Sequence, residues 1–136
     1  MEQDSGNLIV RCGESCKNSP KKELLKKLTV AFVINDKDFW AEHLKNEVIW
    51  DITGVRRING KTSVEKELNR RKQEEIRELQ IHNIITHGNT GAVNGVLIPR
   101  NGENLAFCDV YHFSGHGKKA KIRTITSYII PVPPRN

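Results

Sequence analysis

Apolar residues recur at two different spacings along this chain, every third or fourth residue in its first half and every second residue later. Spacings of three and four are typical of a helix with one buried face. In the first half the pattern is carried by Leu24, Leu25, Leu28, Phe32 and Val33. Ser19 and Pro20 form a helix-start signal, because serine caps free N–H groups and proline fits the first turn. We therefore expect a helix over residues 20–34, followed after "NDKD" (35–38) by a second, short helix.

The rest of the chain predicts a sheet. A strand at about 47–53 is followed by a loop with two glycines and by a charged helix that ends near residue 75. The spacing then changes to two, which indicates strands at 79–87, 92–99, 105–113 and 120–130. Turn sequences separate these strands and "PVPP" stops the last one. Four consecutive strands joined by short turns are typical of an antiparallel meander, and helices on one side of such a sheet make an α+β domain.

The length of 136 residues fits one compact domain. Residues 1–18 show no period, and "NLIVRC" within them is compatible with a short strand or with a surface arm. We expect an N-terminal arm at 1–18, a folded domain at 19–131 and a C-terminal tail at 132–136.

Charge and cysteine content narrow the functional classes. The net charge is +6, but acidic residues interleave most of the basic ones and no basic run alternates with aromatics, so we expect solvated helix faces and no nucleic-acid partner. Three cysteines without an export signal indicate reduced thiols in the cytoplasm. The cysteines and histidines lack the spacing of a four-ligand zinc site, so no metal or other cofactor is expected. The apolar stretches are too short to cross a membrane.

Two aspartates interrupt apolar strands. Asp51 lies within "EVIWDITGVRRING" (47–60), and Asp109 lies within "LAFCDVYHF" (105–113). Side chains alternate along a strand, so Asp109 shares a face with Phe107, Tyr111 and Phe113. A carboxyl in such surroundings loses solvation, which raises its pKa and lets it donate a hydrogen bond. The alternative is that this face is wet, or that Asp109 pairs with a basic residue on the next strand.

The two segments resemble parts of the nuclear transport factor 2-like superfamily, also called SnoaL-like, which includes ketosteroid isomerase. "DITGVRRING" (51–60) is similar to the segment after that enzyme's base aspartate, and "DVYHF" (109–113) to the one that begins with its oxyanion-hole aspartic acid. "NDKDFW" (35–40) is similar to the break between the first two helices in many members. The order of elements agrees from about residue 20 to 130.

The resemblance implies a cone-shaped fold, in which a curved antiparallel sheet and three helices on its concave side enclose a pocket. It implies a homodimer through the outer sheet face and a small apolar or carbonyl-containing ligand. Asp51 would be the general base and Asp109 the acid or oxyanion donor of an isomerase or cyclase reaction. The expected pocket residues are Phe32, Trp40, Phe107, Tyr111 and Phe113.

One departure weakens the catalytic interpretation. Ketosteroid isomerase also uses a tyrosine on its first helix as an oxyanion donor, and the matching position here is near Val30. Loss of one such donor typically lowers the rate about 100- to 1000-fold. A non-catalytic ligand-binding or dimerisation module of the same fold therefore stands as the alternative function.

Overall fold

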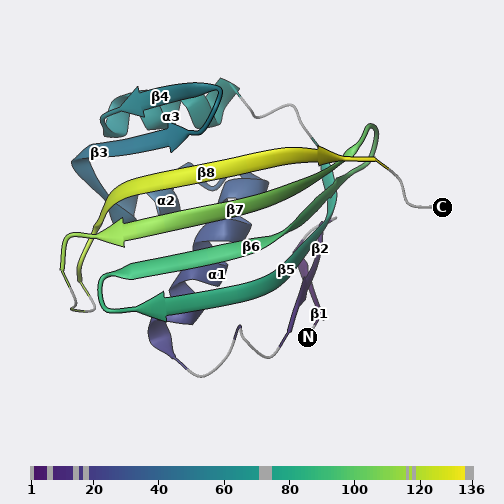
Figure 1. The fold of residues 1–136 in the computed structure, drawn as a ribbon, viewed down its shortest axis with the longest axis horizontal. Coiled ribbons are helices and arrows are strands. Elements are labelled where there is room, and N and C mark those ends of the chain that lie inside the picture. The colour runs from purple at the N-terminus through teal and green to yellow at the C-terminus, as the bar shows by residue number, and fades with distance from the viewer. Residues whose placement is uncertain are drawn as a thin grey trace.

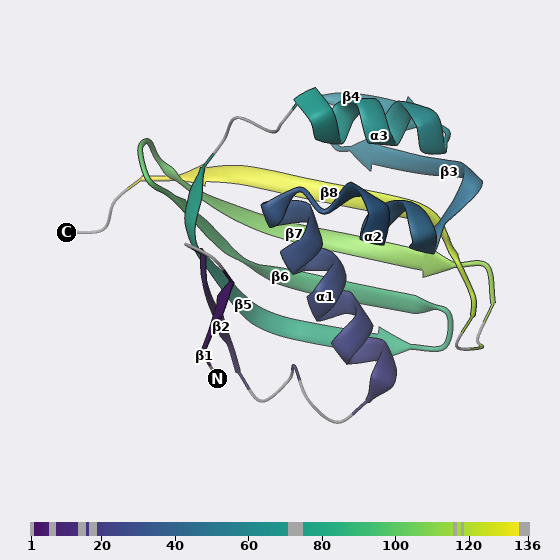
Figure 2. The same ribbon diagram turned by 180° about the vertical axis from the view of Figure 1, so that it is seen from behind.

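The computed structural model describes residues 2–5, 8–13, 16, 19–70, 75–115, 117 and 119–133. They form two layers, a strongly curved sheet and a set of helices that lie together on one of its faces (Figures 1 and 2). In chain order the elements are β1 (Glu2–Ser5), β2 (Leu8–Cys12), α1 (Pro20–Ile34), α2 (Lys37–His43), β3 (Leu44–Ile52), β4 (Arg56–Asn59), α3 (Lys61–Arg70), β5 (Ile76–His87), β6 (Thr90–Pro99), β7 (Asn104–Phe113) and β8 (Ile122–Val132).

Helix α1 begins and ends where local chemistry requires. The Ser19 hydroxyl accepts a hydrogen bond from the Lys22 amide (3.1 Å), and Pro20 occupies the first turn. Asn35 ends the helix in the left-handed conformation at φ 61°, which asparagine tolerates better than most residues. The predicted bounds of this helix are therefore confirmed. Its buried face, with Leu25 and Leu28 fully buried, packs on β5 and β6.

The sheet of the described residues has eight strands in the order β1-β2-β5-β6-β7-β8-β3-β4 and is not closed into a barrel. The meander β5–β8 is antiparallel, as the period of two predicted. The sheet as a whole is mixed, because β2 pairs with β5 and β3 pairs with β8 in parallel. The predicted antiparallel meander is therefore confirmed, and it is part of a larger mixed sheet. Parallel neighbours require long connections, and the connections between these strands contain the helices.

Two segments form strands where none was predicted with certainty. The expected loop after β3 contains β4, and the N-terminal arm contains the β1–β2 hairpin. In β2 the side chains of Leu8, Val10 and Cys12 are buried and belong to the same core cluster as those of α1 and β5. The predicted end of the third helix near residue 75 falls partly on 71–74, which lie outside the described residues, as do 134–136 of the predicted tail.

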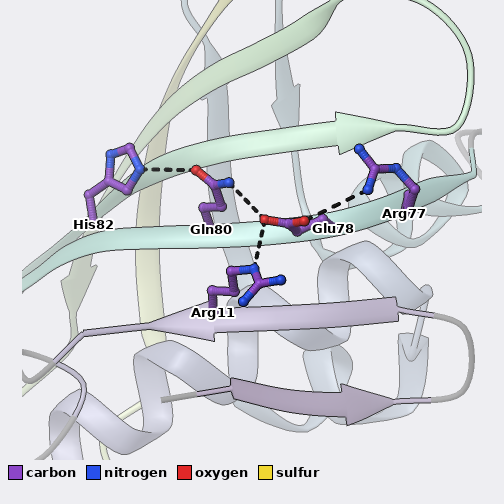
Figure 3. A network of polar contacts seen from close by, with 5 residues as sticks. All are labelled: Arg11, Arg77, Glu78, Gln80 and His82. Carbon is purple, nitrogen blue, oxygen red and sulfur yellow. Dashed lines mark hydrogen bonds and ion pairs between the residues drawn. The ribbon is translucent and has the colours of Figure 1, made fainter.

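A polar network fastens β2 to the main sheet (Figure 3). The Arg11 Nε donates to Glu78 Oε2 over 3.1 Å, and Gln80 Nε2 donates to the same oxygen over 2.7 Å. Arg77 approaches the other carboxylate oxygen at 3.8 Å. The hydrogen bond from Gln80 lowers the pKa of Glu78, the positive charge of Arg11 adds to this effect, and burial opposes it. Glu78 is therefore a buried carboxylate that stays ionised because several donors surround it.

The expectation of reduced thiols is wrong for two of the cysteines. Cys12 and Cys16 are paired as a disulfide with their Cα atoms 6.1 Å apart, and both side chains are buried. The spacing of the two Cα atoms is within the range that disulfides require. The expectation of reduced thiols relied on the odd cysteine count, which does not reveal the distance between Cys12 and Cys16. Cys108 remains a free thiol.

Candidate functional site

An inner cavity lies between α1, α2 and the concave face of the sheet. Its volume is about 20 Å³, which is close to the space that one water molecule needs. Ligand sites for drug-sized molecules occupy roughly 300–1,000 Å³. The cavity is lined by Thr29, Phe32, Val33, Trp40, Trp50, Leu97, Phe107, Asp109, Ser127 and Ile129. The cone interior is therefore largely filled by its own side chains.

Three aromatic rings occupy most of the interior. The ring centroid of Phe32 lies 5.7 Å from that of Trp40 and 5.7 Å from that of Trp50, and the two indoles are 5.9 Å apart. The Phe32–Trp50 pair meets edge to face, with 88° between the ring planes. These distances are those of favourable aromatic pairs, which add about 0.5–1.5 kcal/mol each beyond the burial of their area. The interior is a packed aromatic cluster that joins both helices to β3.

Both indole N–H groups have acceptors. Trp50 donates from Nε1 to the Ser127 hydroxyl over 2.9 Å, and Trp40 donates from Nε1 to the Leu28 carbonyl over 2.8 Å. Thr29 donates its hydroxyl proton to the Leu25 carbonyl in the preceding turn of α1 (2.8 Å). Since an unsatisfied buried donor costs about 1–3 kcal/mol, the bonds to Leu28 and Ser127 fix the orientation of the two indoles.

Asp109 and Tyr111 lie two residues apart on the concave face of β7. Tyr111 is completely buried, and this burial raises the pKa of its phenol well above the usual range. The neighbouring charge of Asp109 raises it further, whereas a hydrogen bond with Thr29 acts in the opposite direction. The phenol therefore stays protonated at physiological pH.

The structure does not bring Asp51 and Asp109 together. In the strand register Asp109 lies opposite Ser127, and Ser127 lies opposite Ile52, so these three residues share the concave face. Asp51 is the residue before Ile52 and pairs with Thr126, which puts it on the outer face. On that face its cross-strand neighbour is Arg57 of β4. Trp50, the residue before Asp51, lies in the cavity wall instead.

The expected pocket residues separate into two groups. Phe32, Trp40 and Phe107 line the inner cavity together with Asp109. Tyr111 and Phe113 are buried on the same sheet face but lie outside the cavity lining. Phe113 is covered by the Lys21 ammonium group, which lies 5.0 Å from the ring centroid. Sequence reasoning missed Thr29 and Ser127, because neither residue type signals burial and their place depends on the register between elements.

A larger hollow lies on the outer face of the sheet. This outer groove has a volume of about 360 Å³ and is lined by Asn83, Ile85, Ala92, Val93, Asn94, Ala106, Phe107, Cys108, Tyr128 and Ile130. Three of the lining side chains are large, apolar or aromatic, and strongly exposed: Ile85 at 63%, Tyr128 at 45% and Ile130 at 62%. Asn83 and Asn94 bond to each other across β5 and β6, with 3.0 Å between Nδ2 and Oδ1.

Two kinds of site receive no support from the described part of the chain. No group of three or more His, Cys, Asp or Glu side chains among the described residues is arranged to hold a metal ion. Within the same residues, no helix is long and apolar enough to cross a membrane.

The fold is shared with known structures. No protein-family model matches the chain, and no curated protein does so either. An NTF2-like protein of unknown function from Cytophaga hutchinsonii is 22% identical over 79% of this chain and 97% of its own, with a TM-score of 0.62. A candidate SnoaL-like polyketide cyclase from Shewanella denitrificans is 10% identical over 83% and 92%, with a TM-score of 0.69. An LEH-like epoxide hydrolase from M. tuberculosis is 20% identical over 79% and 76%, with a TM-score of 0.62.

Agreement of this extent at low sequence identity concerns the backbone. The TM-scores of 0.62 and 0.69 over 79% and 83% of the chain show that its backbone follows the same fold as these structures. The chain has the nuclear transport factor 2-like fold.

Proposed function

We propose that this protein is a non-catalytic module that assembles as a homodimer through the outer face of its sheet. The observation that carries the proposal is the outer groove, with exposed Ile85, Tyr128 and Ile130 on one face. Contiguous exposed apolar surface of this kind is costly in water and marks interaction sites. The inner cavity, by contrast, has room for little more than one water molecule.

The occupant of the groove is a second copy of the chain. A twofold interface uses the same patch on both subunits, so a groove beside a protruding aromatic is suited to self-association. Tyr128 offers a flat apolar ring with a polar tip, a residue type that is enriched at interfaces. In such a dimer Tyr128 of each subunit fills part of the groove of the other.

Sedimentation velocity tests this proposal. We expect the wild-type protein to sediment as a dimer and Ile130→Asp to sediment as a monomer, because the new carboxylate would have to lose its water in the interface. Val55→Asp is the matched control, since Val55 is 67% exposed but lies in the turn after β3, away from the groove. A monomeric wild type, or dissociation by Val55→Asp alone, would refute the proposal.

Asp109 favours a second candidate function, the binding of a small apolar ligand with a carbonyl group. Its carboxyl is part of a wall that otherwise contains Phe32, Trp40, Trp50 and Phe107. Binding would require the aromatic cluster to move, because the cavity is far below the volume of ligand sites. We do not extend this candidate to catalysis by Asp51 and Asp109, since the strand register places the two carboxyls on opposite faces.

The ligand-binding candidate is tested by thermal shift with hydroxylated aromatics, steroids and polyketides. Under this candidate a compound raises the melting temperature of wild type, and Asp109→Asn loses the effect. Asp51→Asn is the matched control and should keep the effect, because Asp51 lies on the outer face. If both variants lose it equally, the two aspartates form one site after all. If no compound stabilises wild type, the second candidate is abandoned.

The compartment is also part of the proposal. Cysteine count and composition predict the cytoplasm, whereas a Cys12–Cys16 disulfide is characteristic of oxidising compartments. We propose that the pair forms wherever the protein meets an oxidising milieu. Alkylation of denatured protein taken rapidly from cells tests this: one labelled thiol indicates the disulfide, and three indicate the reduced form.

A further inference from the structure

Strand β4 leaves one edge of the sheet open. It is the last strand on its side of the sheet and pairs with β3 alone among the described residues (Figure 1). The Gly60 amide donates to the Val48 carbonyl over 2.7 Å, which fixes the direction of the backbone groups along this pair. Because these directions alternate, Arg56 and Ile58 bond to β3, whereas the N–H and C=O groups of Arg57 and Asn59 point outward. The outward groups form a template for one more strand.

The side chains around this edge are predominantly basic. Between Asp51 and Arg70 the chain carries five basic and three acidic residues. One of the acids, Glu67, is buried and already held by Arg56 at 3.4 Å and Arg70 at 2.8 Å. Asp51 lies across from Arg57 and offsets part of its charge. Arg57 and Asn59 are both exposed, as is Lys66 on the neighbouring helix α3.

A second copy of this chain is a poor occupant of the edge. Two β4 strands paired edge to edge would gather Arg56 and Arg57 of both copies along one short strand pair, and such crowding of like charges is destabilising. An acidic strand would be attracted to this edge, because its carboxylates would lie beside these guanidinium groups. Charge therefore selects between the possible occupants of the same backbone template.

We propose that the β4 edge binds an extended acidic segment of another polypeptide as an additional antiparallel or parallel strand. The outward N–H and C=O groups of Arg57 and Asn59 supply the main-chain hydrogen bonds, which is the general mode of β-strand addition. The exposed Arg57 supplies the preference for acidic side chains. This site is separate from the outer groove and does not depend on the dimer.

The test uses the full-length protein and a capped seven-residue peptide of alternating Glu and Val. Amide NMR spectra of the labelled protein should show shifts at Arg57 and Asn59 and slower hydrogen exchange of these two amides. A fully N-methylated peptide of the same sequence keeps the charges but lacks the N–H donors, and it should not bind. Shifts centred on another element, or equal binding of the methylated peptide, would overturn the proposal, as would the absence of any shift.

Two variants separate backbone pairing from charge. Arg57→Glu should weaken the affinity for the peptide about tenfold or more, whereas the exposed Arg123→Glu on β8 should leave it unchanged. Asn59→Pro removes an outward N–H and spares the bonds to β3, so it should abolish binding while the remaining amide spectrum stays folded. If Asn59→Pro disturbs the fold, the methylated peptide still decides the question. A single-stranded oligonucleotide that competes with the peptide would indicate a general polyanion surface and would refute strand addition.

Discussion

The N–H group of the Trp50 indole donates a hydrogen bond to a buried hydroxyl group. Ser127 is only 2% exposed and accepts the Trp50 Nε1–H over 2.9 Å. We expect Ser127→Ala to destabilise the protein by about 1–3 kcal/mol, because it removes the acceptor of a buried donor. Trp50→Phe removes the donor and adds a loss of packing. In urea unfolding the double variant should cost less than the sum of the single variants, with a coupling of about 0.5–3 kcal/mol. Additive effects would show that the hydrogen bond contributes little.

Glu78 makes stability depend on pH. Its pKa is lower in the folded protein than its ordinary value of 4.5, chiefly because Gln80 donates to the carboxylate. A group with a lowered folded pKa contributes stability above its unfolded pKa and loses it as the pH falls through the folded value. We therefore expect Glu78→Gln to be less stable than wild type by about 1 kcal/mol at pH 7, with the difference shrinking below pH 4.5. Urea unfolding at several pH values measures this.

The control for Glu78 is Glu103→Gln in the exposed turn between β6 and β7. That substitution should leave the pH dependence of the wild type intact. If Glu78→Gln differs from wild type by the same amount at pH 3 and pH 7, the carboxylate charge of Glu78 is not what holds the network together.

At the scale of a strand, one glycine is required by the curvature of the sheet. Gly95 on β6 lies opposite Ile81, where β5 has a register shift before Asn83. A Cβ atom at Gly95 would collide with the carbonyl oxygen of Gln80 and would lie 2.9 Å from its carbonyl carbon. These are backbone atoms that cannot rotate away. We expect Gly95→Ala to cost about 3 kcal/mol or more, because overpacking at a fixed site forces the strands apart.

Thermal unfolding with Gly115→Ala as the matched control measures the Gly95 effect. Gly115 lies in the loop after β7, and an added Cβ there meets no heavy atom within 4 Å. The control should therefore melt within a few degrees of wild type. If Gly95→Ala has the same melting temperature as the control, the bulge on β5 does not depend on the glycine opposite it.

The sequence predicted correctly those elements that are determined by residues close together in the chain. Ser19, Pro20 and the leucine spacing identified α1 with its correct bounds, and the alternation around Asp109 put it on the concave face. The open choice for "NLIVRC" and the loop assigned to 54–60 show the limit. The short strand β2 owes its state to β5, a partner far away in the chain that sequence spacing does not reveal. Strand β4 has only one buried side chain in four residues, which is too little alternation to identify it.

The site was harder to predict than the fold for the same reason. Asp51 and Asp109 both interrupt apolar strands, and nothing in either strand alone says which face turns inward. The alternation between Trp50 and Asp51 was visible, but assigning one of them to the cavity required the pairing of β3 with β8. Register between distant strands is a non-local property, and a shift of one residue exchanges the two faces.

At the scale of the whole molecule, the arm and the domain share one core. Leu8 and Val10 are at most 4% exposed and pack in the same cluster as α1 and β5. Burial of such a side chain contributes about 1.5–3 kcal/mol, and β2 also covers the edge of β5. A protein of this size is stable by only about 5–15 kcal/mol in total. We therefore expect a chain that begins at residue 19 to be far less stable than the full chain and to aggregate through the uncovered β5 edge.

Guanidinium-induced unfolding of the full chain and of residues 19–136 measures this dependence. Val10→Ala in the full chain separates the loss of core contacts from the exposure of the β5 edge. It removes core contacts while leaving β2 paired with β5. We expect Val10→Ala to lose stability without aggregating, since the edge stays covered. If the truncated chain is as stable and as soluble as the full one, the boundary predicted at residue 19 is a true domain boundary. If it aggregates while Val10→Ala does not, the arm belongs to the fold as part of the sheet.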